Sequence, residues 1–340
     1  MKRSWLAPLA PLYRAGLAWR EFGLARGWKR VRRLQDPVIS IGNLSTGGSG
    51  KTPLAITLAK LLRARGVRVD VLSRGYGRTS TERARVDPNG AAEKYGDEPL
   101  LIAFATGVPV YVAPQRYDAG LLAEADAEAS VRDESDATQV ARAHILDDGF
   151  QHRQLHRDID ILLLNRDDWR DTLLPAGNLR ETLHAARRAS VIAIPAHDAG
   201  LESELHRWGW TGPVWRLHRR MEIPHIDGSV LAFCGIARPE QFFAGLENAG
   251  VNVAARKTFR DHHRYTRDDI NTLLATARSA KAAALITTEK DAVRLGPLVL
   301  AFPSDLPLVT ANLHTEIEES DAAVDWLITC LASHAASNPL

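Results

Sequence analysis

A glycine-rich segment followed by a lysine and a threonine carries the clearest chemistry in this 340-residue chain. Residues 37–53 read PVISIGNLSTGGSGKTP, which predicts a buried strand, a loop and the start of a helix. The backbone amides of such a loop and the positive end of the helix surround an anion. Lys51 would reach the β- and γ-phosphates of a nucleotide, and Thr52 would bind its Mg²⁺ ion. The loop residues expected to contact the phosphates are Ser45, Thr46, Gly47, Gly48, Ser49 and Gly50.

The sequence departs from the phosphate-binding pattern at one position, and the segment also has one alternative interpretation. The strict pattern has glycine where the chain has Ser45. A glycine-rich turn that only joins a strand to a helix is the alternative. Because strand, loop, Lys51-Thr52 and helix follow in the right order, we predict that the chain binds ATP or GTP.

Two adjacent carboxylates follow the apolar run 144–146, where a parallel strand is expected to end. In a phosphate-binding sheet this end faces the ligand, so Asp147 or Asp148 is a candidate to bind the Mg²⁺ ion. A plain Asp-Asp-Gly turn is the alternative. Gln151 and His152 follow directly, and they would contact the substrate or satisfy the backbone of the loop.

A second acidic pair, Asp97 and Glu98, begins a predicted helix after Gly96. Acids in a first helical turn complement the helix dipole, which is the simplest explanation for both. One acid could instead accept a proton from a substrate hydroxyl while the other binds metal. Further along, His262 and His263 are neighbours in an extended segment and point in opposite directions, so one histidine paired with a carboxylate for proton transfer is the more economical hypothesis.

Basic residues could also bind phosphate. Arg74 and Arg78 lie on a glycine-containing loop after the run 67–72. Their guanidiniums could bind phosphate, or they could be ordinary basic residues of a surface loop. Residues 288–291 read TEKD, a pattern similar to a guanine-reading motif, but the order of the residues is wrong and GTP is not inferred.

Short apolar runs alternate with helix-length segments along the chain, which indicates βαβ units and a mostly parallel sheet. We predict an α/β fold with a P-loop NTPase-like sheet, helices on both faces and a second, smaller α/β domain. Residues 79–94 and 125–143 interrupt the alternation and are expected to form a mobile loop and a surface helix or insertion. The expected regions are an N-terminal interfacial region at 1–35, an ATP-binding domain at 36–213, a connector at 214–228 and the smaller domain at 229–340. We expect the active site in the cleft between the two domains.

Composition limits the class of protein. The chain is 45% hydrophobic and 25% charged. Its net charge is +2, but the charge is uneven, because residues 1–35 contain nine Lys/Arg and one acid. Tryptophan, leucine and phenylalanine interleave with these cations, which is typical of an interfacial helix or of a helix packed on the protein with a solvated basic face. No apolar run is long enough to span a bilayer, and no nucleic-acid motif accompanies the basic residues. Cys234 and Cys330 are expected to be free thiols.

Seven blocks occur in order along most of the chain: IGNL (41–44) with GGSGKTP (47–53), LSRGY (72–76), GDEP (96–99), LDDGFQHR (146–153), LPAGNLRE (174–181), FRDH (259–262) and TTEKD (287–291). Together they resemble the tetraacyldisaccharide 4′-kinase family, which phosphorylates the 4′-hydroxyl of a lipid A precursor. The resemblance implies an ATP- and Mg²⁺-dependent enzyme with an acylated disaccharide 1-phosphate as substrate. It also implies a peripheral position on the cytoplasmic face of the inner membrane, held by the N-terminal helix.

The resemblance also implies residue roles. Asp97 and His262 would deprotonate the 4′-hydroxyl, although which of His262 and His263 is used stays open. The two predicted domains would have to close to bring that pair together. Lys51 would be the third catalytic residue, and the implied metal ligands are Thr52, Glu98, Asp147 and Asp148. The implied substrate contacts are Arg74, Arg116, Gln151, His152, Asn178 and Arg180.

Two other functions fit the phosphate-binding loop. A P-loop kinase or ligase for a soluble substrate would act without lipid and would not need the N-terminal helix. A nucleotide-gated membrane switch would bind partners and transfer no phosphate. We expect neither nucleic acid nor an obligate protein partner.

Overall fold

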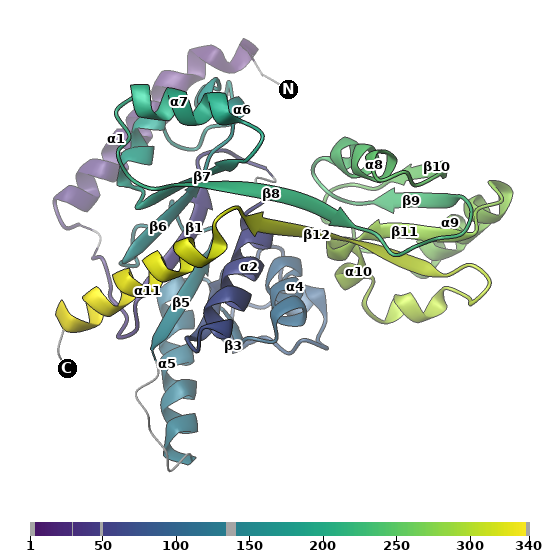
Figure 1. The fold of residues 1–340 in the computed structure, drawn as a ribbon, viewed down its shortest axis with the longest axis horizontal. Coiled ribbons are helices and arrows are strands. Elements are labelled where there is room, and N and C mark those ends of the chain that lie inside the picture. Colours follow the sequence, from purple (N-terminus) through teal and green to yellow (C-terminus); the bar gives the residue numbers. More distant parts are fainter. Residues whose placement is uncertain (1–3, 29, 48–49, 134–140, 338–340) are drawn as a thin grey trace.

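The computed structural model describes residues 4–28, 30–47, 50–133 and 141–337. Its described strands form one sheet that passes through two lobes (Figure 1). The strands are β1 (Val38–Asn43), β2 (Arg68–Ser73), β3 (Ala84–Arg85), β4 (Val110–Val112), β5 (Arg142–Asp147), β6 (Ile159–Leu163), β7 (Val191–Pro195), β8 (Val214–Glu222), β9 (Val230–Cys234), β10 (Val253–Thr258), β11 (Ala284–Thr288) and β12 (Leu308–Ile317). Their order across the sheet is β10-β9-β11-β12-β8-β7-β6-β1-β5-β2-β4-β3.

The helices fill the segments between these strands. They are α1 (Ala10–Ala25), α2 (Lys51–Ala64), α3 (Ala92–Tyr95), α4 (Asp97–Thr106), α5 (Arg116–Asp133), α6 (Arg166–Trp169), α7 (Ala199–Arg207), α8 (Pro239–Asn248), α9 (Arg267–Ser279), α10 (Glu289–Leu295) and α11 (Ser320–Ser337), with short 3₁₀ helices at Ser4–Leu9, Leu183–Arg188 and Gly296–Ala301. The predicted α/β class with a mostly parallel sheet is confirmed.

The large lobe has helices on both faces of its sheet because its central strands are apolar on both sides. Strand β1 is buried along its whole length. On one face, α2, α4 and α11 pack against the strands through residues such as Leu58 and Ile102. On the other face, α5 covers the strands around β5, and α7 covers β6 and β7. The lobe is therefore a three-layer sandwich that holds β1 at its centre.

Strand β1 pairs in parallel with β5 on one side and with β6 on the other. The chain leaves β1 through the glycine-rich loop into α2 and then continues to β2, beyond β5. Connections that diverge from a central strand leave a crevice at the carboxyl ends of the strands. This topology places the predicted phosphate-binding loop at that crevice.

The small lobe repeats the three-layer arrangement on a smaller scale. Helix α9 covers one face of β9 and β11, with Leu273 against Phe233 in a single buried cluster. Helix α8 covers the opposite face through Phe242, Phe243 and Leu246. The turn Gly235–Arg238 and the start of α10 lie at the carboxyl ends of these strands, on the side toward the large lobe (Figure 1).

The domain boundaries stay a prediction, and the described structure differs from them at two places. Residues 214–222, expected in a connector, form the long strand β8, which pairs antiparallel with β12 and crosses between the lobes (Figure 1). Helix α11, expected in the smaller domain, packs on the large lobe through Val324 and Leu327. The expected range 229–340 is therefore not one packing unit, because α11 presents an apolar face that only the large lobe covers.

The two expected interruptions contain regular structure. Residues 79–94 include the edge strand β3, which pairs antiparallel with β4, and part of α3. Helix α5 occupies the start of 125–143, and β5 begins near its end. Residues 134–140 of that segment lie outside the described residues.

A buried ionic cluster lies at the opposite end of β5 from the crevice. The fully buried His144 places Nδ1 2.7 Å from Asp70 Oδ1 and Nε2 3.6 Å from Glu124 Oε1. Burial alone would lower the pKa of His144, but Asp70 and Glu124, with Asp36 nearby, raise it to about 10. His144 is therefore an imidazolium that compensates buried carboxylates at neutral pH.

This cluster predicts a specific loss of stability at alkaline pH. The stabilising contribution of His144 is complete below its unfolded-state pKa of about 6.5 and is lost as the pH rises toward the folded-state value of about 10. We expect the free energy of unfolding of the wild type to fall more steeply across this window than that of His144→Gln, measured by urea unfolding. The exposed His225→Gln variant is the matched control. An alkaline slope shared by wild type and His144→Gln would contradict the assignment.

Candidate active site at the boundary of the two lobes

The glycine-rich loop leaves the buried strand β1 and enters α2 at Gly50, whose φ of 91° lies in the left-handed region. Lys51 is the first residue of α2, and its Nζ donates to Asn43 Oδ1 at 3.0 Å. Asn43 Nδ2 in turn donates to the backbone oxygen of Ser45 at 2.9 Å. Sequence reasoning assigned no role to Asn43, which holds both Lys51 and the start of the loop. Gly48 and Ser49 lie outside the described residues.

Three carboxylates gather beside this lysine. Asp147 is 2% exposed, and within the described part of the chain its Oδ1 has no hydrogen-bond partner. Burial, followed by the nearby charges of Glu98 and Asp148, raises the pKa of Asp147 to about 7. Asp148 lies 3.5 Å from Lys51 Nζ and 3.1 Å from Arg180 Nη2. Although burial acts to raise the pKa of Asp148, these cations lower it.

These residues fit a bound Mg²⁺ ion. Magnesium prefers carboxylate and hydroxyl oxygens. Thr52 lies buried in the first turn of α2, and the unpaired oxygen of Asp147 lies in an excess of negative charge at the same edge of the sheet. A divalent cation would remove that excess, so the structure is consistent with Thr52, Glu98, Asp147 and Asp148 as candidate metal ligands.

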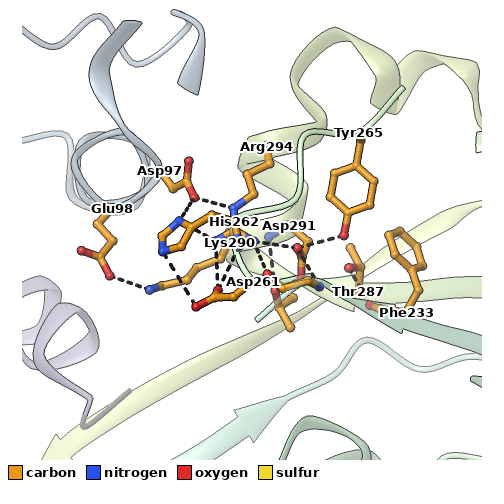
Figure 2. Close-up of polar contacts among 12 residues, drawn as sticks. Asp97, Glu98, Phe233, Asp261, His262, Tyr265, Thr287, Lys290, Asp291 and Arg294 are labelled. Carbon is orange, nitrogen blue, oxygen red and sulfur yellow. Dashed lines mark hydrogen bonds and ion pairs between the residues drawn. The ribbon is translucent and has the colours of Figure 1, made fainter. Parts of the chain in front are cut away.

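A carboxylate–imidazole pair joins the two lobes. His262 Nδ1 lies 2.8 Å from Asp97 Oδ2, at the start of α4 (Figure 2). His262 adopts φ of 58°, a left-handed conformation that is uncommon outside glycine. The hydrogen bond that His262 donates to Asp97 raises the pKa of His262. Although burial acts to raise the pKa of Asp97, His262 and Arg294 lower it. The predicted closure therefore needs no further movement here, because the pair is already in contact.

The neighbouring histidine has a different environment. His263 Nε2 lies 3.1 Å from Asp269 Oδ2, and its ring stacks on Phe259 with 4.6 Å between centroids. It is held within the small lobe. Of the two histidines left open by the sequence, the structure brings His262 to Asp97.

Basic and polar candidates border the same site. Burial lowers the pKa of Arg116, which lies near Asp148 and Arg74. Burial and the positive charge of Arg116 lower the pKa of His152 to about 4, so this ring is neutral. Gln151 Nε2 donates to the backbone oxygen of Asn43 at 2.7 Å. Arg116 thus lies near Asp147 and Asp148, Arg74 and His152 lie near Arg116, and Gln151 is bonded to the end of β1, while their contact with substrate stays a prediction.

Two candidates on the 174–181 segment behave differently. Arg180 donates to Asn43 Oδ1 at 2.7 Å and pairs with Asp148, so it is part of the site. The Asn178 side chain instead donates to Asp171 Oδ2 at 2.8 Å, within its own loop. The backbone oxygen of Asn178 accepts from the amide of Thr46 in the glycine-rich loop. The substrate contact by the Asn178 amide stays a prediction, and it would compete with the hydrogen bond to Asp171.

Two arginines that sequence reasoning missed lie at the glycine-rich loop. The guanidinium of Arg219, which comes from β8, lies against Gly50, whose φ of 91° itself favours glycine. A Cβ on Gly47 would lie 3.8 Å from Nη2 of Arg238 in the small lobe. Sequence spacing gave no signal for either residue, because both are more than 160 positions from the loop.

Comparison with known proteins agrees with this geometry. A family model described as tetraacyldisaccharide-1-P 4′-kinase matches residues 2–332. The chain belongs to this family. Tetraacyldisaccharide 4′-kinase of Koribacter versatilis is 42% identical over 332 residues, which cover 94% of this chain and 97% of that relative. The enzyme of Geobacter metallireducens is 38% identical over 320 residues, which cover 86% of this chain and 89% of that relative.

A solved member of the family has the same fold. The crystal structure of LpxK from Aquifex aeolicus in complex with ATP has a TM-score of 0.75 and 32% sequence identity, and the match covers 97% of this chain and 99% of that one. The predicted tetraacyldisaccharide 4′-kinase family, the P-loop fold class and the prediction of a kinase are confirmed. The roles of individual residues in this family member stay predictions.

The close packing of β1 against the loop after β5 can be tested with one methyl group. A Cβ on Gly42 would lie 2.5 Å from Phe150 Cβ and 2.8 Å from Phe150 N. We expect Gly42→Ala to displace the Asp148–Phe150 loop and to cost about 1–3 kcal/mol of unfolding free energy, measured by urea unfolding. Gly16→Ala is the control, because nothing lies within 4 Å of its Cβ position. Equal stabilities of the two variants would contradict this account.

Proposed function

We propose that this chain transfers the γ-phosphate of ATP to the 4′-hydroxyl of a tetraacyl disaccharide 1-phosphate. The observation that carries the proposal is the 2.8 Å contact between Asp97 and His262 across the lobes, next in sequence to Glu98, whose charge acts on Asp147. Family membership supports the reaction, and the ATP complex of the Aquifex aeolicus relative supports the donor.

Phosphoryl transfer needs positioning and charge neutralisation more than covalent chemistry from the protein. Lys51, at the start of α2, would neutralise the phosphates. Arg180 contacts the same Asp148 oxygen, Oδ1, and would add a second positive charge there. Mg²⁺, held by the candidate ligands, would supply further positive charge to the transferred group.

Asp97 and His262 would remove the proton of the acceptor hydroxyl. A lone aspartate is a weak base, with a pKa of about 3.9, whereas an imidazole has a pKa of about 6.5. A carboxylate in contact with an imidazole can pass the proton on and share it. The Nδ1–Oδ2 contact between His262 and Asp97 provides this route in one step.

Removing either member of the pair should affect transfer and not nucleotide binding. We expect Asp97→Asn and His262→Gln to lower kcat about 10²–10⁴-fold, because each loses proton transfer in the transition state. The affinity for ATP should stay within about twofold, because the described contacts of Asp97 and His262 are with each other and with Arg294. Transfer of labelled γ-phosphate to tetraacyl disaccharide 1-phosphate in detergent micelles measures kcat, and calorimetry measures ATP binding.

The exposed His225→Gln variant is the control for the histidine substitution. Wild-type turnover in Asp97→Asn, or a large loss of ATP binding, would refute the role of the pair. A deacylated acceptor run in parallel separates the lipid kinase from a kinase of soluble substrates, because equal turnover of both acceptors would favour the latter. ATP binding by the wild type without any acceptor phosphorylation would favour the nucleotide-gated switch.

We also propose that the N-terminal helices contact the cytoplasmic leaflet of the inner membrane. None of the described helices is long and apolar enough to cross a membrane. Trp5 and Leu12 are 78% and 71% exposed, and Trp19, Phe22 and Trp28 form an aromatic cluster toward the end of α1. Exposed aromatics among arginines are typical of a helix that lies at the lipid headgroups.

The helix α1 is nevertheless fixed to the large lobe near the site. Tyr13 donates to the backbone oxygen of Arg180 at 3.0 Å, and Arg20 pairs with the buried Glu181 at 2.8 Å. The same segment therefore joins the exposed apolar side chains to Arg180, which binds Asp148. An acyl substrate in the membrane would meet the protein close to its reacting groups.

Membrane contact can be tested without removing the helix. We expect the triple variant Trp5→Ala, Leu12→Ala and Trp19→Ala to bind anionic vesicles at least about tenfold more weakly, because each lost burial in lipid costs about 1.5–3 kcal/mol. ATP binding should not change. Leu300→Ala, which removes an 89% exposed leucine from the small lobe, is the control in the same vesicle sedimentation assay. Unchanged binding of the triple variant would end this proposal.

A further inference from the structure

Helix α10 of the small lobe presents two cations, one helical turn apart, to the start of α4 in the large lobe (Figure 2). Lys290 Nζ lies 2.7 Å from Glu98 Oε1, and Arg294 Nε lies 2.5 Å from Asp97 Oδ2. Residues four apart share one face of a helix, so the two cations of α10 each contact one of the two adjacent carboxylates of α4. Every one of these contacts crosses from one lobe to the other.

Residues of the small lobe hold the guanidinium of Arg294 in a fixed orientation. Its side chain is 3% exposed, and Nη1 donates to the backbone oxygen of Gly235 at 2.5 Å and to Asp291 Oδ1 at 3.1 Å. The fully buried Asp291 also accepts from Tyr265 Oη at 2.9 Å and from Thr288 Oγ1 at 2.6 Å. A planar guanidinium fixed at several points has its remaining donors aimed in one direction.

The remaining donors of Arg294 point toward Asp97 and His262. Both His262 Nδ1 and Arg294 Nε contact the same oxygen of Asp97, Oδ2. Arg294 Nη2 also lies 3.3 Å from His262 Nδ1. Because both contacts are to Oδ2, together they fix the orientation of the Asp97 carboxylate.

We propose that Arg294 is a positioning residue for phosphoryl transfer, which orients the Asp97 carboxylate and the His262 ring toward the acceptor hydroxyl. This inference rests on the proposed roles of Asp97 and His262. Arg294 acts through these two residues and touches no substrate. The buried network around Asp291 exists on the small lobe alone, so docking of the lobes delivers an already oriented guanidinium to Asp97.

Two variants separate positioning from a structural role. We expect Arg294→Met to lower kcat about 10²-fold, because a misplaced catalytic group costs about that much. The KM for ATP should stay within about twofold. Arg294→Lys keeps the positive charge beside Asp291 but loses the fixed fork of donors, so it should also lose most of its kcat. Added guanidinium ion should restore part of the activity of an Arg294→Ala variant.

The exposed Arg278→Ala variant on α9 is the matched control and should keep wild-type kcat, and thermal unfolding of each variant reports folding. Wild-type kcat in Arg294→Met or full activity in Arg294→Lys would overturn the inference. Loss of activity that follows only the loss of folded protein, without rescue by guanidinium, would also overturn it. If Arg294→Met does not fold, Arg294→Lys decides. Wild-type turnover of Asp97→Asn would instead show that the proposed function of the pair has failed.

Discussion

Buried negative charge is the constraint on which this site depends. Asp147 is buried at the edge of the sheet, with the partly exposed Asp148 and Glu98 near it, and negative charges gathered in this way are costly unless cations compensate them. Compensating cations come from separate elements, with Lys51 from α2 and Lys290 from α10. Each cation must be held at a defined place, so the loop after β1 and the approach of the small lobe are both determined by the same electrostatic requirement.

Much of this arrangement could be predicted from the sequence because it is local. The glycine-rich loop, Lys51 and Thr52 are consecutive, and Asp147 directly follows an apolar strand. The chemistry of these residue types at these spacings, with the alternation of strands and helices, was enough to predict the parallel sheet and its reactive edge. The resemblance to a kinase family supplied the pairing of Asp97 with His262, which spacing alone could not.

The remainder depends on distant residues. Arg294 is 197 positions from Asp97, and nothing in either local segment indicates their contact. Helix α11 follows the small lobe in sequence but packs on the large lobe, because only that lobe offers an apolar surface to Val324 and Leu327. Asn178 stands in a sequence block that resembles the family, yet its side chain bonds to Asp171 in its own loop. Family position and local pattern do not determine the direction of a side chain.

The strands that join the lobes have a mechanical consequence. Strands β8 and β12 are hydrogen-bonded from Leu217 with Ile317 to Glu222 with Asn312, in an unbroken antiparallel register. Sliding β8 along β12 would break these bonds together, and separating the lobes would stretch both strands. Twisting and bending leave the bonds intact, and two-stranded ribbons twist readily. Relative motion of the lobes is thus confined to a few rotational degrees of freedom, so an open form would return to the same docking geometry at each closure.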